Sequence, residues 1–124
     1  LGDPAVIVGG GPMTGPAVVD ILGPVVKNLS GILALSADEA AFDENRPCIR
    51  CARCVEVCPM GLTPNLLGEL SHRGFFQKAG KLRIQDCIEC GLCSYACPSK
   101  RALVTWIKDG KAGLAAERAK EKVS

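Results

Sequence analysis

The residues of this sequence best suited to chemistry are eight cysteines that fall in two runs of one pattern. The runs are Cys48-x2-Cys51-x2-Cys54-x3-Cys58-Pro59 and Cys87-x2-Cys90-x2-Cys93-x3-Cys97-Pro98, and no cysteine lies outside them. Three cysteines at i, i+3 and i+6 on a tight loop can point their sulfurs at one iron–sulfur cube, while a fourth, just before a proline, is carried away from that loop. This spacing predicts two [4Fe–4S] clusters.

The fourth cysteine of each run is expected to bind the cluster of the other run, because the runs are crossed in two-cluster proteins of this type. The ligands predicted for the first cluster are Cys48, Cys51, Cys54 and Cys97. The ligands predicted for the second cluster are Cys87, Cys90, Cys93 and Cys58. The crossing would bring the two clusters close together, so that electrons can pass between them.

Other uses of eight cysteines fit this pattern less well. Disulfides usually scatter the cysteines through a small secreted domain, whereas here the cysteines cluster at metal-ligand spacing. Two zinc sites would use two CxxC pairs each, which leaves the third cysteine of each run and both Cys-Pro pairs without a reason. A c-type haem needs CxxCH, and the only histidine, His72, is far from any CxxC.

Length and composition limit the remaining function classes. A chain of 124 residues fits one domain or two small ones. The formal net charge of +2 and the aromatic content of 4% give no signature of nucleic-acid binding. Hydrophobic residues make up 48% of the chain, yet Asp20, Lys27 and Asp38 interrupt its apolar stretches, so no run approaches the length of a membrane span. We therefore expect no nucleic-acid partner, and any membrane contact should be peripheral.

The N-terminal part of the chain is predicted to form short strands and turns. The apolar runs that predict strands span residues 6–8, 24–27 and 31–35, with glycine- and proline-rich turns between them. The glycine cluster that follows the first run does not make a dinucleotide-binding fingerprint, because Thr14 stands where the third glycine should be. Pro12 and Pro16 also argue against the helix that such a fingerprint opens.

The rest of the chain is predicted to be mainly helical. Ser36 and Glu39 have the spacing of a capping box, which predicts a short helix or turn ahead of the first cysteine run. The connection from Cys58 to Cys87 is too long for a bare loop. Thr63 and the proline after it, followed by leucines at helical spacing, predict that this connection is a hairpin of two helices.

A last helix is predicted after the second cysteine run. Ser99 is expected to cap it, and Leu103, Trp106 and Ile107 are expected to share its inner face. Its charged end, residues 117–122, is expected to fray. Helices would therefore frame both clusters.

The side chains around the two runs differ in charge. Arginines at 46, 50 and 53 surround the first run, whereas Asp86 and Glu89 flank the second. Reduction adds negative charge to a thiolate-bound cluster, so nearby cations raise its potential. We therefore expect the first cluster to be the easier one to reduce. The alternative is that these side chains point to water and are screened.

The apolar side chains near the cysteines are predicted to exclude water from the clusters. The residues expected to form this shell are Ile49, Val55, Ile88 and Leu92. Tyr95 and Trp106 are expected to be packing residues. Met60 is not expected to be a ligand, because cysteines already fill all the iron positions, and His72 has no partner that suggests catalysis.

Both cysteine runs, with the segments before them, resemble the C subunit of the Rnf ion-translocating ferredoxin:NAD oxidoreductase complexes. The resemblance rests on residues 47–62 and 86–99, together with residues 10–15 and 24–33 upstream. It implies an α+β fold in which a partial β-grasp (soluble-ligand-binding) segment at residues 1–36 precedes a mainly helical dicluster ferredoxin domain at residues 37–124. The sequence departs from the family at residues 100–102, where the family tends to place a proline-containing apolar link.

The resemblance also implies a function. It is that of an electron-transfer subunit, itself a non-catalytic relay, which passes electrons through two [4Fe–4S] clusters between an NAD or flavin site and a membrane-bound ion-translocating redox complex. In that family an FMN and an NADH site lie N-terminal to this region, so they would belong to a segment ahead of Leu1. The implied location is cytoplasmic, at the periphery of a prokaryotic cell membrane.

Two partner classes and one alternative function remain open from the sequence. The partners would be other subunits of the membrane complex, among them a ferredoxin-like or flavin-bearing subunit. The alternative is that the chain is the cluster module of a soluble flavin- or cobalamin-linked reductase, since related reductases share this module.

Overall fold

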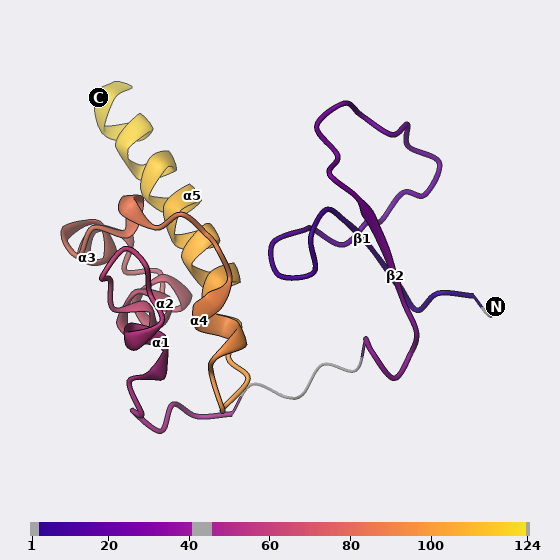
Figure 1. The fold of residues 1–124 in the computed structure, drawn as a ribbon. Coiled ribbons are helices and arrows are strands. Elements are labelled where there is room, and N and C mark those ends of the chain that lie inside the picture. Colours follow the sequence, from indigo (N-terminus) through magenta and orange to yellow (C-terminus); the bar gives the residue numbers. More distant parts are fainter. Residues whose placement is uncertain (1–2, 41–45, 124) are drawn as a thin grey trace. The chain divides into compact units, whose positions relative to one another are not determined.

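The computed structural model describes residues 3–40 and 46–123. The chain divides into two compact units, Leu1–Asp43 and Glu44–Ser124, which we call the N-terminal and the C-terminal unit (Figure 1). The strands lie in the first unit and the described helices in the second. A small antiparallel sheet followed by a mainly helical unit confirms the α+β fold class predicted from the sequence.

The sheet of the N-terminal unit has two strands, β1 (Val6–Gly9) and β2 (Ile32–Leu35). They pair antiparallel with Val6 opposite Leu35, so two of the three predicted strands are confirmed. The third prediction, at residues 24–27, is wrong, because this segment forms no strand and Val26 accepts a turn hydrogen bond from Leu29 N–H at 3.0 Å. A proline cannot donate to a sheet, and no neighbouring strand pairs with this segment.

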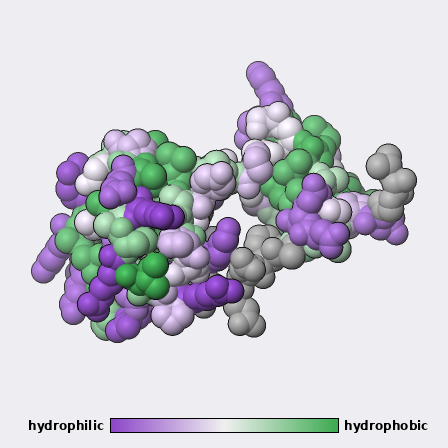
Figure 2. Space-filling model, turned by 60° about the horizontal axis from the view of Figure 1, so that its bottom comes forward, coloured by the Kyte–Doolittle hydropathy of each residue, from purple (hydrophilic) through white to green (hydrophobic). Residues whose placement is uncertain are grey.

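Many apolar side chains of the N-terminal unit are exposed. They include Val19, Ile21, Leu22, Val25, Val26 and Ile32. Figure 2 shows hydrophobic residues gathered on one face of this unit, at the right of the view. The unit therefore buries little: among its described residues only Val8 belongs to the hydrophobic core.

The capping box predicted at Ser36 is present on a turn. Ser36 donates from its backbone N–H and its hydroxyl to the Glu39 carboxylate at 3.0 and 2.9 Å, and Glu39 N–H donates back to Ser36 Oγ at 3.4 Å. These hydrogen bonds lower the pKa of Glu39. Ala40 N–H closes the turn on the Ser36 carbonyl, and residues 41–42 of the predicted segment lie outside the described residues.

The C-terminal unit consists of helices joined by short loops. They are α1 (Arg53–Glu56), α2 (Pro64–His72), α3 (Phe76–Lys81), the 3-10 helix η1 (Ile84–Asp86), α4 (Leu92–Tyr95) and α5 (Leu103–Val123). α2 and α3 form the hairpin predicted between the two cysteine runs, and the long helix α5 packs against both (Figure 1). Helices therefore frame both runs, as the sequence predicts.

The ends of these helices differ from the sequence predictions in three ways. Thr63 precedes the first residue of α2, but its side chain makes no capping hydrogen bond. α5 begins at Leu103, four residues after Ser99, so Ser99 is not its N-cap residue. The Ser94 hydroxyl accepts the Val104 N–H at 2.9 Å, one of the donors that a helix start leaves free. The predicted fraying of residues 117–122 is wrong as well, because α5 continues to Val123. Gln77 holds this end through a 2.9 Å hydrogen bond to Glu117.

The core of the C-terminal unit lies where α5 crosses α2. Its largest fully buried side chains are Leu67, Ile84, Leu103, Ile107 and Leu114. Leu103, Ile107 and Leu114 recur at helical spacing on one face of α5, which confirms the face predicted from the sequence. Glycines let the two helices approach closely: a Cβ on Gly68 would lie 3.0 Å from Leu103 Cδ2.

We expect Gly110→Ala to destabilise this crossing. A Cβ on Gly110 would lie 2.9 Å from Ile84 Cδ1 and would overlap Ser71, whose buried hydroxyl donates to the Leu67 carbonyl at 2.8 Å. Overpacking of a tight contact of this kind costs about 1–3 kcal/mol. Anaerobic thermal unfolding of the cluster-loaded protein measures the loss, and Asp109→Ala, at the exposed neighbouring position, is the control. Equal stability of the two variants would contradict the close contact of Gly110 with Ser71 and Ile84.

Candidate metal centres

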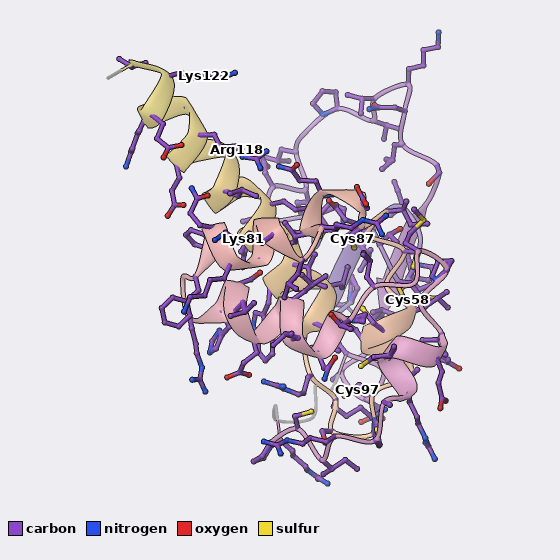
Figure 3. The ribbon with its side chains drawn as sticks, turned by 90° about the vertical axis from the view of Figure 1, so that its left-hand side faces the viewer. Cys58, Lys81, Cys87, Cys97, Arg118 and Lys122 are labelled. Atoms are coloured by element: carbon purple, nitrogen blue, oxygen red, sulfur yellow. The ribbon has the colours of Figure 1, made fainter. Side chains whose placement is uncertain are left out.

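The structure gathers the eight cysteines around two cavities in the C-terminal unit. The cavity that we call the first is lined by Cys48, Cys51, Cys54 and Cys97. The second cavity is lined by Cys58, Cys87, Cys90 and Cys93. Each run therefore lends its fourth cysteine to the other cavity, which is the grouping that the crossed pattern predicts. Figure 3 shows Cys58 and Cys87 in one region and Cys97 apart from them.

The thiols surround these cavities and do not meet at one point. Among the described residues, no three His, Cys, Asp or Glu side chains are grouped so that they could hold one metal ion. Four separated thiols around an apolar hollow suit a cluster of several irons, each bound by one thiolate. The donor set therefore fits a [4Fe–4S] cluster at each cavity, and the ligand assignment itself stays a prediction.

Both cysteine loops have the same backbone conformation. Arg50 and Glu89, each two residues after the first cysteine of its run, have φ of 56° and 57°. Ala52 and Gly91, two residues further on, are left-handed as well and immediately precede α1 and α4. A left-handed residue before a single helical turn reverses the chain, so the third cysteine of each run points back toward the first two. The two runs therefore fold as equivalent motifs.

The buried cysteines lie in a poorly solvated environment. Burial raises the pKa of the Cys93 thiol to about 11, and burial also raises the pKa of Cys54. A thiol must lose its proton to bind metal, so the positive charge of bound iron has to compensate the desolvation of these two sulfurs. This environment favours a cationic metal group over free thiolates in the cavities.

Backbone amides supply part of the stabilisation that thiolates need. Leu62 N–H lies 3.4 Å from Cys58 Sγ, and Glu89 N–H lies 3.4 Å from Cys87 Sγ. A hydrogen bond from the Asn65 backbone lowers the pKa of Cys54 against the effect of burial. N–H groups that point at sulfur raise the potential of a bound cluster.

The two cavities differ in their exposure to solvent. Cys48 and Cys51 are exposed, whereas all four cysteines of the second cavity are buried or half-buried. The first cavity is therefore the one closer to the surface. An electron carrier outside the protein would reach it more readily than the second.

Arg101 is a residue of the first cavity that the sequence did not single out as functional. Its side chain is 11% exposed, donates to Glu69 at 2.8 Å and lies over the Trp106 ring. Burial opposes its charge, but hydrogen bonds to Glu69 and to Cys48 outweigh burial and hold the pKa of Arg101 above its usual value. A permanently charged guanidinium therefore lies beside a predicted ligand. The only sequence signal at Arg101 was that residues 100–102 differ from the proline-containing link that is typical of the family.

Lys111 has a comparable position at the second cavity. Its ammonium group donates to Glu89 at 2.6 Å and to the Cys87 carbonyl at 2.8 Å. Asp86 is paired as well, with Arg83 at 2.6 Å. Both acidic side chains that flank the second run are thus neutralised by partners, which reduces the charge difference expected from the sequence. The order of cluster reduction stays a prediction.

The effect of the first-run arginines can be tested directly. Replacing Arg50 and Arg53 by Gln removes two positive charges near an anion that becomes more negative on reduction. We expect the potential of the first cluster to fall by tens of millivolts, where about 59 mV is a tenfold change for a one-electron couple. Redox titration followed by EPR resolves the two centres, and Lys120→Gln with Lys122→Gln is the matched control. An unchanged potential would show that both arginines are screened by solvent.

The apolar side chains around the cavities match the predicted shell in part. Ile49 lines the first cavity, and Ile88 and Leu92 line the second, although Ile49 remains 67% and Ile88 60% exposed. Val55 packs against the buried group formed by Cys54, Cys93 and Leu103. The shell is therefore thin on its outer side.

The two aromatic residues behave differently. Trp106 packs as predicted, with its ring stacked on His72 at 4.6 Å between ring centres. The prediction that Tyr95 is a packing residue is wrong, because it is 78% exposed. α4 is a single turn that turns Cys93 inward, and this leaves Tyr95, two residues further on, on the outer side.

No helix in the described part of the chain is both long enough and apolar enough to cross a membrane. α5 has 21 residues, but charged side chains are spread along it.

Comparison with known proteins agrees with the geometry. Residues 47–102 match the family described as a 4Fe-4S dicluster domain. Over 110 residues, or 89% of this chain and 25% of the relative, it is 42% identical to the C subunit of the ion-translocating oxidoreductase complex of Methanosarcina acetivorans. Over 120 residues, or 95% of this chain and 27% of the relative, it is 43% identical to the C subunit of the Na(+)-translocating ferredoxin:NAD(+) oxidoreductase complex of Acetobacterium woodii.

A third relative matches over a shorter stretch. Over 73 residues, or 59% of this chain and 14% of the relative, the identity to the C subunit of the ion-translocating oxidoreductase complex of Rhodobacter capsulatus is 48%. The chain thus spans about a quarter or less of the length of these relatives. The long matches include both units as well as the two cysteine runs, and the chain therefore belongs to the family of C subunits of the ion-translocating (Rnf) oxidoreductase complexes.

Proposed function

We propose that this chain is the electron-relay part of such a C subunit. It would pass electrons through two [4Fe–4S] clusters between an NAD or flavin site and a membrane-bound ion-translocating complex. The observation that carries the proposal is the pair of cavities, each surrounded by four thiols, with one cysteine exchanged between the runs. FMN and NADH would bind in parts of a C subunit that this chain does not span.

The residues between the cavities suit electron transfer. Each bound cluster would supply a site that gains and loses one electron. Cys54 of the first cavity and Cys93 of the second pack into one buried group with Leu103, so the two cavities adjoin through a buried apolar contact. On the side of the unit away from this contact, α2 and α5 pack together through the buried leucines Leu67 and Leu114. The chain thus holds two neighbouring thiol sets that share a buried side, and a relay of this kind needs no catalytic base or nucleophile.

The location and the partners follow from this proposal. We infer a cytoplasmic position at the periphery of a prokaryotic cell membrane, next to other subunits of the complex, one of them ferredoxin-like or flavin-bearing. The names of the relatives, which describe ion-translocating and ferredoxin:NAD(+) oxidoreductase complexes, support this inference.

The cluster content provides the test of the proposal. Anaerobically purified protein is expected to contain close to eight irons and eight sulfides per chain, because two complete sets of four thiols are present. Iron and acid-labile sulfide analysis measures both numbers, and EPR of the reduced protein should show two interacting centres. A content of four irons, or zinc in their place, would contradict the two-cluster relay.

A further inference from the structure

The first cavity opens beside a positively charged cleft. This cleft, which we call the arginine cleft, has a volume of about 470 Å³ and is lined by Pro47, Cys48, Arg50, Asn65, Leu66, Glu69, Arg73 and Arg101. Three arginines and a single carboxylate give it a net positive charge. The cleft lies wholly within the C-terminal unit.

The arginine cleft and the first cavity share part of their walls. Cys48, Arg50 and Arg101 line both of them, and so does Asn65. Cys48 is also exposed. A molecule seated in the cleft would therefore be separated from the first cavity by only one layer of side chains, one of which is a predicted cluster ligand.

Charges at the cleft are held in place but not cancelled. Glu69 accepts from Arg101 at 2.8 Å and from Arg73 at 2.7 Å, so one carboxylate serves two guanidinium groups. Arg101 is nearly buried, whereas the Arg73 side chain is 64% exposed. Arg50 is exposed and makes no ion pair with any residue that the structure describes. The surplus positive charge is thus carried by Arg50 and Arg73, at the surface.

The rim of the cleft has the composition of a protein interface. Residues 46–53 are exposed throughout and carry two further arginines, Arg46 and Arg53, on either side of the 67% exposed Ile49. Interfaces are enriched in arginine and depleted in lysine, and the fully buried centre of an interface is more apolar than the rest of the surface. The second cavity carries less positive charge at its surface, because Lys111 pairs with the Glu89 beside it and its exposed neighbours Tyr95 and Ile88 are uncharged. The two cavities therefore present different surfaces.

From this arrangement we propose that the arginine cleft docks an acidic electron-carrier protein, which exchanges electrons with the cluster at the first cavity. The inference rests on the proposed relay function and adds the entry point and the charge of the partner. In the exchange one electron leaves one protein and enters the other, and no bond is formed or broken. Complementary charge would steer the carrier to the cleft and raise its association rate, with a strong dependence on salt.

The test uses the full chain with both clusters, reduced by dithionite and freed of excess reductant. The probe is the soluble domain of cytochrome b5, an acidic haem protein, whose reduction is followed by stopped-flow absorbance. We expect the second-order rate constant to fall about tenfold or more between low and high ionic strength. Arg50→Glu with Arg73→Glu should lower the low-salt rate constant by about tenfold or more and abolish its salt dependence. The affinity of oxidised cytochrome b5 for the oxidised protein should also be weaker at high ionic strength and weaker for the double arginine variant.

Lys120→Glu with Lys122→Glu is the matched control, because it makes the same change of net charge at the exposed end of α5. Figure 3 shows Lys122 at the opposite end of the unit from Cys97. This variant is expected to stay within about twofold of the unmodified protein. The direction of the change in rate constant separates docking from redox tuning. Added negative charge near the first cluster would lower its potential and so make the reduction of cytochrome b5 faster, whereas loss of docking makes it slower.

A basic c-type cytochrome serves as a second probe, with a charge opposite to that of cytochrome b5. Its reduction should become faster with Arg50→Glu and Arg73→Glu, because repulsion at the cleft turns into attraction. Equal slowing of cytochrome b5 by the arginine and lysine variants, or no slowing by either, would overturn the docking proposal. If charge reversal lowers the iron content, the pair Arg50→Gln and Arg73→Gln provides the same comparison with a smaller effect.

The relay function and the docking site fail in different ways. If the unmodified protein lacks two clusters, iron analysis and EPR show it before any cytochrome is added. In that case the proposed function is lost, and the affinity measurement with oxidised cytochrome b5 still decides whether the cleft binds an acidic protein. If both clusters are present and reducible but the cleft variants react like the unmodified protein, the docking site alone is wrong.

Discussion

Cys58→Ser is expected to remove or disrupt the cluster built on Cys87, Cys90 and Cys93 and to leave the cluster of its own sequence neighbours in place. Cys58 lines the second cavity, and its sulfur lies 3.4 Å from the Leu62 N–H, which holds it there. Serine offers a hydroxyl that is a much weaker ligand for iron than a thiolate. The iron content should drop from about eight toward about four per chain, since each cluster holds four irons.

EPR of the reduced variant identifies which centre is affected. The signal of the first cluster should persist, without the magnetic interaction that a second reduced cluster produces. Cys97→Ser is the reciprocal variant, because Cys97 lines the first cavity although it belongs to the second run. Loss of the first cluster in Cys58→Ser, together with loss of the second in Cys97→Ser, would mean that each run binds its own cluster.

Anaerobic removal of iron by a chelator is expected to unfold most of the C-terminal unit. Its core is small: beyond the buried cysteines, only a handful of large side chains are fully buried, and α1 and α4 are single turns that the cysteine loops lead into. Units of this size depend on metal for much of their stability, and the free energy of metal binding becomes folding free energy. The crossing of α2 and α5 alone is not expected to replace it.

Far-UV circular dichroism should record this loss as a fall in helix content, and limited proteolysis should cut between the two cysteine runs. The N-terminal unit is an internal control, because its sheet has its own hydrogen bonds and holds no cysteine. NMR signals of β1 and β2 should therefore be the same before and after chelation. An unchanged helix signal would show that packing of α5 on α2 suffices to hold the unit together.

Local patterns in the sequence predicted a large part of this structure. The spacing of the cysteines predicted two equivalent loops, and the crossed pattern of two-cluster proteins predicted which cysteine each run lends to the other. The hairpin of α2 and α3 and the Ser36–Glu39 capping box were equally predictable. Such features depend on residues a few positions apart, and their geometry follows from the backbone.

The sequence-based predictions were wrong where a local pattern is compatible with more than one structure. Residues 24–27 have the composition of a strand, but a strand also needs a partner, and in the described part of the chain β1 pairs with β2 and makes a single further bridge, from Val8 to Ala17. Ser99 looked like a helix cap, yet α5 begins at Leu103, and the Val104 N–H donates to the hydroxyl of Ser94, which belongs to α4. Tyr95 became exposed because α4 gives its inner side to Cys93.

The charges beside the cavities were decided by tertiary structure alone. Arg101 reaches Glu69 across 32 positions of the sequence, and Lys111 reaches Glu89 across 22. Counting charges near each cysteine run missed both cations, because they arrive on α5 and on the loop before it. The cysteine spacing, read with the crossed pattern of two-cluster proteins, predicted which thiols gather at each cavity, whereas the packing of α5 decided the charge around them. The reason is that the turns of each cysteine loop follow from local backbone geometry, while an ion pair forms only after distant segments have packed.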